Sequence, residues 1–173
     1  MRIADRPRDR VDNMRLPPLR LAFTFYEDGI GEYSAMTGLD ATFIDGQSRI
    51  VEEWKTLLSF KSVSTAPEHN QDCLDCAAWL RDHIAQIGFD VELLETGSKP
   101  VVYAERRGAP GAPTVLFYGH YDVQPVDPID AWTSPPFAPE IRDGCMYARG
   151  AQDNKGQHFY VLKINRTKAD LTK

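Results

Sequence analysis

The fold of this chain is decided by residues 114–122, which read Thr-Val-Leu-Phe-Tyr-Gly-His-Tyr-Asp. Positions 114–118 are apolar or β-favouring on both alternating faces, which is typical of a central strand covered on both sides. A histidine and an aspartate follow directly, at the strand end where open α/β sheets bind ligands. The stretch therefore predicts a buried strand over 114–119 with polar side chains just beyond its carboxyl end.

The segments on either side predict an α/β layered domain. Apolar residues at helical spacing indicate two upstream helices, and short apolar runs indicate two strands before residue 114. These elements are expected at 50–58 (capped by Asp45 or Ser48), 71–86 (stopped by Gly88), 90–95 and 101–107. Downstream, Asp143-Gly144 predicts a type I′ turn between strands at 140–142 and 145–149, and a helix is expected to begin near Lys155.

Length and charge exclude several classes of protein. The chain has 173 residues, 42% of them apolar, and a formal net charge of −5. This length is about one domain, and no apolar run approaches the roughly 20 residues of a membrane span. An acidic chain without a block of Lys or Arg is a poor binder of nucleic acid or an anionic membrane, so neither is expected as a partner. Residues 1–38 are expected to form a poorly ordered extension, with the folded part at 39–173.

Targeting and cysteine patterns favour a cytoplasmic protein. Acidic residues among the first arginines are unlike a transit peptide, and no apolar secretory segment follows the first methionine. The spacing of Cys73 and Cys76 is compatible with a zinc knuckle or a redox pair. Because it falls inside a predicted helix and no second pair follows, two structural thiols, one of them turned inward, is the preferred interpretation. Cys145 is expected to be a small strand residue.

Three side chains are candidates for metal chemistry. His120 and Asp122 are two residues apart, so in an extended stretch they share one side, where a carboxylate can orient an imidazole. Asp153 lies in a loop flanked by Gly150 and Gly156 before the predicted helix, from which it can reach the same crevice. Imidazole and carboxylate ligands suit zinc, cobalt or manganese. Taken alone, such a histidine is more often structural and such an aspartate more often caps a helix, so the residues by themselves leave the metal site open.

Two linked motifs carry a resemblance to a known family. They are 119–125 (Gly-His-Tyr-Asp-Val-Gln-Pro) and 149–156 (Arg-Gly-Ala-Gln-Asp-Asn-Lys-Gly), with Trp-Thr-Ser-Pro-Pro-Phe at 132–137 between them. In residue identity and spacing they resemble the dinuclear zinc amidohydrolases. This family comprises aminoacylases, carnosinase-type dipeptidases, glutamate carboxypeptidases and succinyl-diaminopimelate desuccinylases. The likeness spans about 39–158 and is strongest to the dipeptidase branch.

The resemblance implies a fold and a set of roles. The fold is a zinc-exopeptidase-like layered domain with a mostly parallel central sheet between helices. His120 matches a ligand of one of two zinc ions, and Asp153 matches the aspartate that bridges both. Asp122 matches the catalytic carboxylate that orients the imidazole, and the bond between Asp153 and Asn154 is expected to be cis. The implied reaction is metal-assisted amide hydrolysis with a glutamate as general base.

The family pattern is incomplete in this sequence. The glutamate pair, the later zinc ligands and the dimerisation domain have no counterpart, and residues 163–170 do not resemble the small-residue helix of the family. We therefore expect the N-terminal part of a dipeptidase-like catalytic domain, inactive alone, whose full-length relatives hydrolyse small peptides and are often homodimers. A deacylase of N-acyl amino acids and a non-catalytic remnant that binds a metal or a partner remain alternatives.

Overall fold

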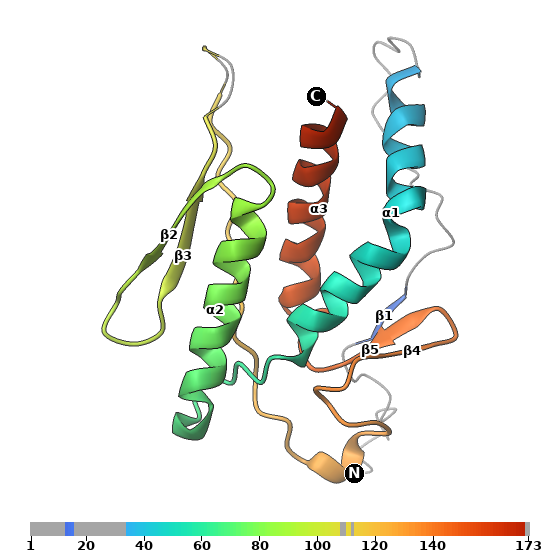
Figure 1. Cartoon of the computed structure of the whole chain (residues 1–173). Helices are drawn as coiled ribbons and strands as arrows, with labels where there is room; N and C mark the ends of the chain where they lie inside the picture. The colour runs from blue at the N-terminus through green and yellow to red at the C-terminus, as the bar shows by residue number, and fades with distance from the viewer. Residues whose placement is uncertain (1–12, 16–33, 108–109, 112, 172–173) are drawn as a thin grey trace, which may run out of the picture.

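The computed structural model describes residues 13–15, 34–107, 110–111 and 113–171, which form helices and two small sheets (Figure 1). The helices are α1 (Ser34–Ser59), α2 (Asn70–Ala85) and α3 (Lys155–Leu171). The strands are β1 (Asn13–Arg15), β2 (Asp90–Leu94), β3 (Val101–Glu105), β4 (Glu140–Arg142) and β5 (Cys145–Tyr147). Short 3₁₀ turns occur at Pro67–His69 and Ile129–Ala131. In this part of the chain no helix is both long and apolar enough to cross a membrane.

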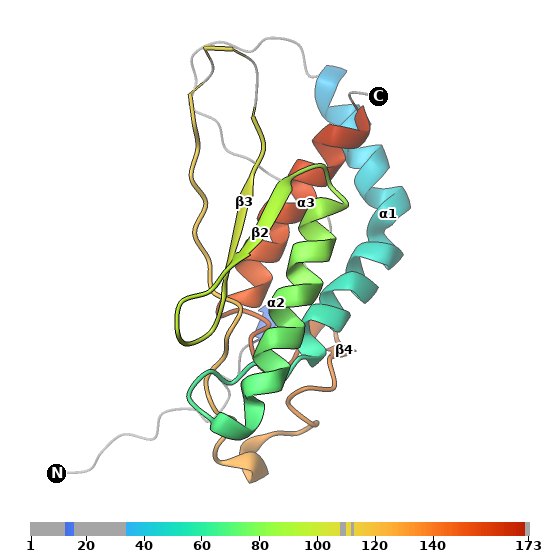
Figure 2. The ribbon, with the colours of Figure 1, turned by 60° about the vertical axis from the view of Figure 1, so that its left-hand side comes forward.

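The three helices pack around one core. Helix α3 contacts α1, and α2 lies against the β2–β3 hairpin on the other side of the molecule (Figures 1 and 2). Trp54 of α1 stacks on Phe159 of α3 with ring centroids 6.4 Å apart. Burying a large apolar side chain contributes about 1.5–3 kcal/mol, so each large member of this cluster stabilises the fold. Its buried members are Trp54, Leu57, Leu58, Cys76, Leu80, Ile84, Met146, Ala148, Ala151 and Phe159.

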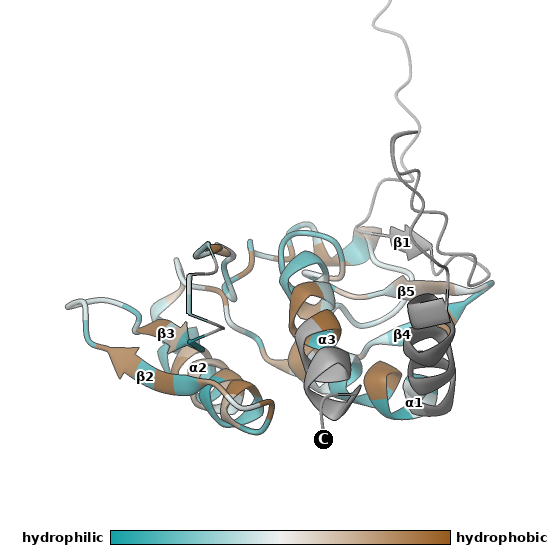
Figure 3. Cartoon of the chain, turned by 90° about the horizontal axis from the view of Figure 1, so that it is seen from above, coloured by the Kyte–Doolittle hydropathy of each residue, from teal (hydrophilic) through white to brown (hydrophobic). Residues whose placement is uncertain are grey.

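The β2–β3 hairpin confirms the strands predicted at 90–95 and 101–107. The two strands pair antiparallel, with Asp90 opposite Glu105 and Leu94 opposite Val101. Burial alternates along both strands, as a sheet with one covered face requires. Figure 3 shows hydrophobic residues on both strands.

The second sheet has the order β1-β5-β4, with antiparallel pairs throughout. Asp143 and Gly144 have φ angles of 49° and 72°, as the predicted type I′ turn requires, and Cys145 begins β5 as expected. Most of the predicted extension over 1–38 lies outside the described residues. Two described parts of it, Asn13–Arg15 and the first turn of α1, lie in regular elements.

The strand predicted over 114–119 is not formed. Residues 113–122 adopt no regular element, and Leu116 and Tyr118 are 89% and 90% exposed. A strand forms only where a neighbour satisfies its backbone hydrogen bonds, and no described strand pairs with this segment. The expected mostly parallel sheet is therefore not present in the described residues, where every strand pair is antiparallel.

The helix predictions hold in position but not in every boundary. Helix α2 matches the predicted 71–86, and Gly88 follows it with a φ of 85°. Helix α1 begins at Ser34, so Asp45 and Ser48 lie inside it rather than at its cap. The sequence between Ser34 and Asp45 contains no proline, so nothing interrupts the helix there. Helix α3 begins at Lys155 as predicted.

Candidate metal centre

His120 is held by contacts to both of its ring nitrogens and to its backbone. Its backbone N–H donates to Asn154 Oδ1 at 3.2 Å. Its Nδ1 lies 3.1 Å from Asp122 Oδ1 and 3.1 Å from the Asp122 carbonyl oxygen. Its Nε2 lies 3.2 Å from Asp153 Oδ1. The structure thus brings together all three side chains that the sequence analysis singled out.

These contacts determine which nitrogen of His120 carries the proton. The Asp122 carbonyl oxygen and ionised carboxylate can only accept hydrogen bonds, so Nδ1 must be the donor. In the neutral ring Nε2 is then an acceptor, and it faces the Asp153 carboxylate, another acceptor. Two acceptors at this distance need a proton or a cation between them.

The donor set fits a divalent metal ion. Two ligands of a tetrahedral zinc ion with bonds of about 2.0–2.1 Å lie about 3.3 Å apart, close to the observed 3.2 Å between Nε2 and Oδ1. The side chains of His120, Asp122 and Asp153 are 39%, 37% and 68% exposed, so an ion can reach them from solvent. The described residues contain no group of three or more His, Cys, Asp or Glu that could hold a metal ion, so the candidate ligands here are a pair, His120 and Asp153.

The loop that carries Asp153 is set by two tight backbone features. Gly150 has a φ of 81°, and a Cβ built there would lie 2.7 Å from Val123 Cγ1, so only glycine fits. The peptide bond between Asp153 and Asn154 is cis, as the family resemblance implies. The loop is therefore packed directly against the segment that follows His120.

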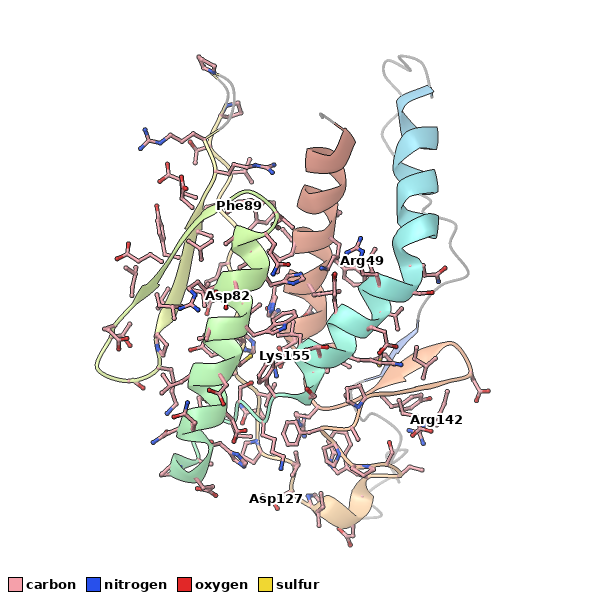
Figure 4. The ribbon with its side chains drawn as sticks, viewed as in Figure 1. Arg49, Asp82, Phe89, Asp127, Arg142 and Lys155 are labelled. Carbon is pink, nitrogen blue, oxygen red and sulfur yellow. The ribbon has the colours of Figure 1, made fainter. Side chains whose placement is uncertain are left out.

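Lys155 anchors the same loop to the end of α1 (Figure 4). Its side chain is fully buried, and its Nζ donates to the carbonyl oxygens of Leu57 at 3.1 Å and Phe60 at 2.8 Å. Leu57 lies in the last turn of α1, where helix oxygens have no partner within the helix, and Phe60 directly follows the helix. Burial lowers the pKa of the Lys155 ammonium. Its hydrogen bonds fix the start of α3, two residues after Asp153.

His158 lies one turn further along α3. Burial, with smaller contributions from the charges of Lys155 and His120, lowers the pKa of His158 to about 4, so the ring is neutral near pH 7. Its Nε2 is buried and has no hydrogen-bond partner among the described residues. It is a second imidazole beside the site, behind His120.

The loop between the two motifs is braced by Trp132 and Arg149. The Arg149 guanidinium lies 5.0 Å from the centroid of the Trp132 ring and donates to the Pro125 carbonyl oxygen at 3.1 Å. The Trp132 indole N–H donates to the Val126 carbonyl oxygen at 2.9 Å. These contacts hold the loop between the two motifs in shape.

The cysteines take no part in the site. Cys73 and Cys76 are both free and fully buried in α2, so the expectation that only one turns inward is wrong. Burial raises the pKa of Cys76 to about 11, which disfavours the thiolate needed for metal binding or redox chemistry. The interpretation as structural thiols fits both observations.

Sequence reasoning missed three residues of the site: Ser64, Lys155 and His158. Ser64 Oγ donates to Asp122 Oδ2 at 2.5 Å, across 58 positions of sequence. No local pattern reveals such a contact. The lysine and the second histidine do lie within four residues of Asn154, so their closeness to the predicted ligands was the available signal.

Parts of the chain are similar to known proteins. The family model for peptidase family M20/M25/M40 matches residues 116–172. Succinyl-diaminopimelate desuccinylase of Dechloromonas aromatica (strain RCB) is 45% identical over 92 residues, which are 53% of this chain and 23% of that protein. The enzyme of the same name from Acinetobacter baumannii (strain AYE) is 46% identical over 80 residues, 46% of this chain and 21% of that protein. The chain thus spans less than a quarter of these relatives.

Solved structures are similar as well. Human carnosine dipeptidase 1 has a TM-score of 0.75 at 28% identity, covering 80% of this chain and 32% of that one. An M20 family metallo-carboxypeptidase of Sulfolobus solfataricus has a TM-score of 0.65 at 35% identity, covering 71% and 28%. The di-peptidase Dug1p of Saccharomyces cerevisiae has a TM-score of 0.70 at 24% identity, covering 80% and 31%, and shows likeness of fold alone.

These likenesses confirm the α/β fold class and define a metallopeptidase fold of which this chain covers part. Residues 116–172, about a third of the chain, match the family model, so over this part the chain is similar to peptidase family M20/M25/M40.

Proposed function

We propose that this chain is part of an enzyme that hydrolyses a peptide or amide bond with the help of a divalent metal, most closely a dipeptidase. The observation that carries the proposal is the pair of acceptors, His120 Nε2 and Asp153 Oδ1, that face each other at 3.2 Å. His120 and Asp153 would hold the ion, zinc in the first place and cobalt or manganese as substitutes. In the complete site, Asp153 would bridge two such ions.

His120 and Asp153 would bind the ion, and the residues around them orient these ligands. Asp122 keeps the proton on Nδ1 of His120 and so leaves Nε2 free to bind. Asn154 accepts from the His120 backbone, which joins the two motifs directly. When bound, metal ions in such a site lower the pKa of a water molecule and polarise the scissile carbonyl.

A dipeptide substrate is supported by the likeness to human carnosine dipeptidase 1 at 28% identity. A second candidate is removal of an acyl group from an N-acyl amino acid, favoured by the 45% identity to a desuccinylase. Both reactions cleave an amide with the same donor atoms, so the ligand pair does not distinguish them.

The free, buried cysteines fit a reducing compartment, and we propose that the protein is cytoplasmic.

The reaction class is tested by transplanting the site. In the Dechloromonas aromatica desuccinylase, the segment that aligns with residues 114–157 is replaced by this chain's residues, and the chimera is assayed with dipeptides and succinylated amino acids. We expect metal-dependent hydrolysis that disappears when the chimera also carries His120→Ala. A folded chimera that binds zinc and hydrolyses neither class of substrate would contradict the proposal and favour a non-catalytic remnant.

The 173-residue chain itself is expected to give no turnover. Its described residues supply one imidazole and one bridging carboxylate, without a carboxylate base positioned beside them. Purified chain is incubated with the same substrates and added zinc, cobalt or manganese. Turnover above the metal-only blank that vanishes with His120→Ala would show that another group of this chain completes the site.

A further inference from the structure

Ser64 contacts the carboxylate that orients His120. Its hydroxyl donates to Asp122 Oδ2 at 2.5 Å, while the other oxygen, Oδ1, lies 3.1 Å from His120 Nδ1. Each oxygen of Asp122 therefore has its own partner. A hydroxyl that donates to one oxygen and a ring N–H that donates to the other fix the rotation of the carboxylate plane.

The position of Ser64 is fixed by neighbouring backbone contacts. Ser62 Oγ donates to the Tyr121 carbonyl oxygen at 2.7 Å, and the Val123 N–H donates to the Ser62 carbonyl oxygen at 2.9 Å. Ser62 is fully buried and Val123 is buried. These bonds tie the segment after α1 to both neighbours of Asp122, so Ser64 is placed opposite the carboxylate by the backbone.

The fixed carboxylate matters because Asp122 is partly solvated. Its side chain is 37% exposed, so without Ser64 water competes for Oδ2 and the carboxylate gains rotational freedom. A hydrogen bond to a charged acceptor is stronger than one between neutral groups. Rotation of the carboxylate would weaken the preference for the proton at Nδ1 of His120, and Nε2 would then carry it for part of the time.

We propose that Ser64 is a positioning residue of the metal centre: it holds Asp122 in the orientation that keeps the proton on His120 Nδ1 and leaves Nε2 as the ligand atom. The inference rests on the proposed function for its purpose, but the geometry concerns this chain's own residues. It adds the segment after α1 to a site otherwise built from the two motifs. The role needs only a hydroxyl donor at this position, so threonine can replace serine and alanine cannot.

The test is nitrogen NMR of the His120 ring in the metal-free full chain at pH 8, in an Asp153→Ala background that removes the acceptor facing Nε2. With serine at position 64 the ring should be mainly the Nδ1–H tautomer, and Ser64→Ala should shift it toward a mixture. Ser64→Thr should restore the ratio seen with serine. Ser59→Ala is the matched control, because that exposed serine donates only to the Thr56 carbonyl oxygen of its own helix. Ser64→Cys, a weaker donor of similar shape, serves if Ser64→Ala does not fold.

Cobalt binding measures the consequence for the site. We expect Ser64→Ala to weaken Co²⁺ binding by about tenfold, at the lower end of the effect of such supporting residues, with a weaker d–d absorption band. Adding Ser64→Ala to Asp122→Ala should change nothing further, because Ser64 acts through Asp122.

The outcomes separate this inference from the proposed function. An unchanged tautomer ratio in Ser64→Ala, or a full additional loss of Co²⁺ affinity in the Asp122→Ala background, would overturn the role of Ser64. Co²⁺ binding that is equally tight in His120→Ala would overturn the metal site instead, and the tautomer ratio would still decide the role of Ser64.

Discussion

Gly119 has no side chain, and Asn154 of the second motif and His158 of α3 lie directly beside its Cα. A Cβ built there would lie 2.9 Å from Asn154 Oδ1 and 2.9 Å from His158 Cβ. Distances this short force a shift, and the Asn154 oxygen is also the acceptor for the His120 backbone N–H. The absence of a side chain at position 119 thus lets the start of α3 approach His120.

We predict that Gly119→Ala destabilises the chain by about 1–3 kcal/mol, the usual cost of overpacking, measured by urea unfolding. The matched control is Gly46→Ala inside α1, where a Cβ would meet the flexible end of Arg49 at 3.1 Å and Ile50 Cδ1 at an ordinary contact distance of 3.7 Å. There alanine should be neutral or stabilising by up to about 1 kcal/mol, since glycine is unfavourable within a helix. Equal effects at the two positions would contradict the close approach at Gly119.

His158 should make stability depend on pH. Its pKa is about 4 in the fold, against 6.5 as the ordinary value. Between these values the unfolded chain binds more protons than the folded one, so stability is full above about pH 6.5 and falls as the pH drops toward 4. At about 1.4 kcal/mol per pKa unit the full loss is on the order of 3 kcal/mol.

Urea unfolding of the wild-type chain and of His158→Gln from pH 7.5 to 4 measures this contribution. The difference in unfolding free energy between the two should change with pH across the window. The control His69→Gln replaces a partly exposed histidine that contacts Asp72, and it measures what a histidine substitution outside the core does to stability. A flat difference for His158→Gln would show that His158 is not buried as a neutral ring.

The sequence predicted some residues of the candidate metal centre and not others. His120, Asp122 and Asp153 lie in motifs whose spacing carries information, and the structure brings them together. Ser64 could not be predicted, because its contact with Asp122 depends on how the segment after α1 packs against residues 121–123. Lys155 likewise acts through carbonyl oxygens that only the folded end of α1 places beside it.

At the level of the elements, a polar cluster joins the three helices. Lys163 of α3 is buried and contacts Glu53 of α1 and Nε2 of His83 of α2. The ring of His83 also stacks on Trp79 with centroids 4.5 Å apart. Burial alone would raise the pKa of Glu53, but hydrogen bonds from Lys163 and Arg49 bring it below its ordinary value. The three helices therefore share one ion pair in their common core.

We predict that Glu53→Gln lowers the unfolding free energy by about 2–3 kcal/mol, because it removes the negative charge that the buried Lys163 ammonium contacts. The adjacent Glu52→Gln is the matched control. Glu52 is 70% exposed and pairs with Lys55 within the same helix, so its loss should cost at most about 0.5 kcal/mol. Thermal or urea unfolding of both variants measures the difference, and similar small effects would show that the cluster is not stabilising.

Elements with local signals were predicted well, and elements that depend on distant partners were not. The helical spacing of apolar residues predicted α2, and Asp143-Gly144 predicted the β4–β5 turn, because both patterns act within a few residues. The apolar run at 114–118 predicts a central strand, yet a strand also needs neighbours to pair with. No described strand supplies such neighbours, so residues 114–118 form no regular element and their large side chains are exposed.

At the scale of the whole chain, the candidate metal centre lies where distant parts of the sequence converge. The end of α1, the segment at 120–123 and the start of α3 are linked by the hydrogen bonds of Ser62, Ser64, Asn154 and Lys155. The described residues therefore bring together the two motifs, 119–125 and 149–156, and the segment after α1 that contacts them. It covers less than a quarter of its curated relatives.

The most direct measurement is calorimetric titration of Zn²⁺ into the full chain and three variants. We predict that binding is lost in His120→Ala and in Asp153→Ala, because each removes a ligand atom. In Asp122→Ala it should be weakened by about 10–100-fold, since this carboxylate orients a ligand without binding the ion. Binding of equal strength in all four proteins would contradict the assignment and place the metal elsewhere in the chain.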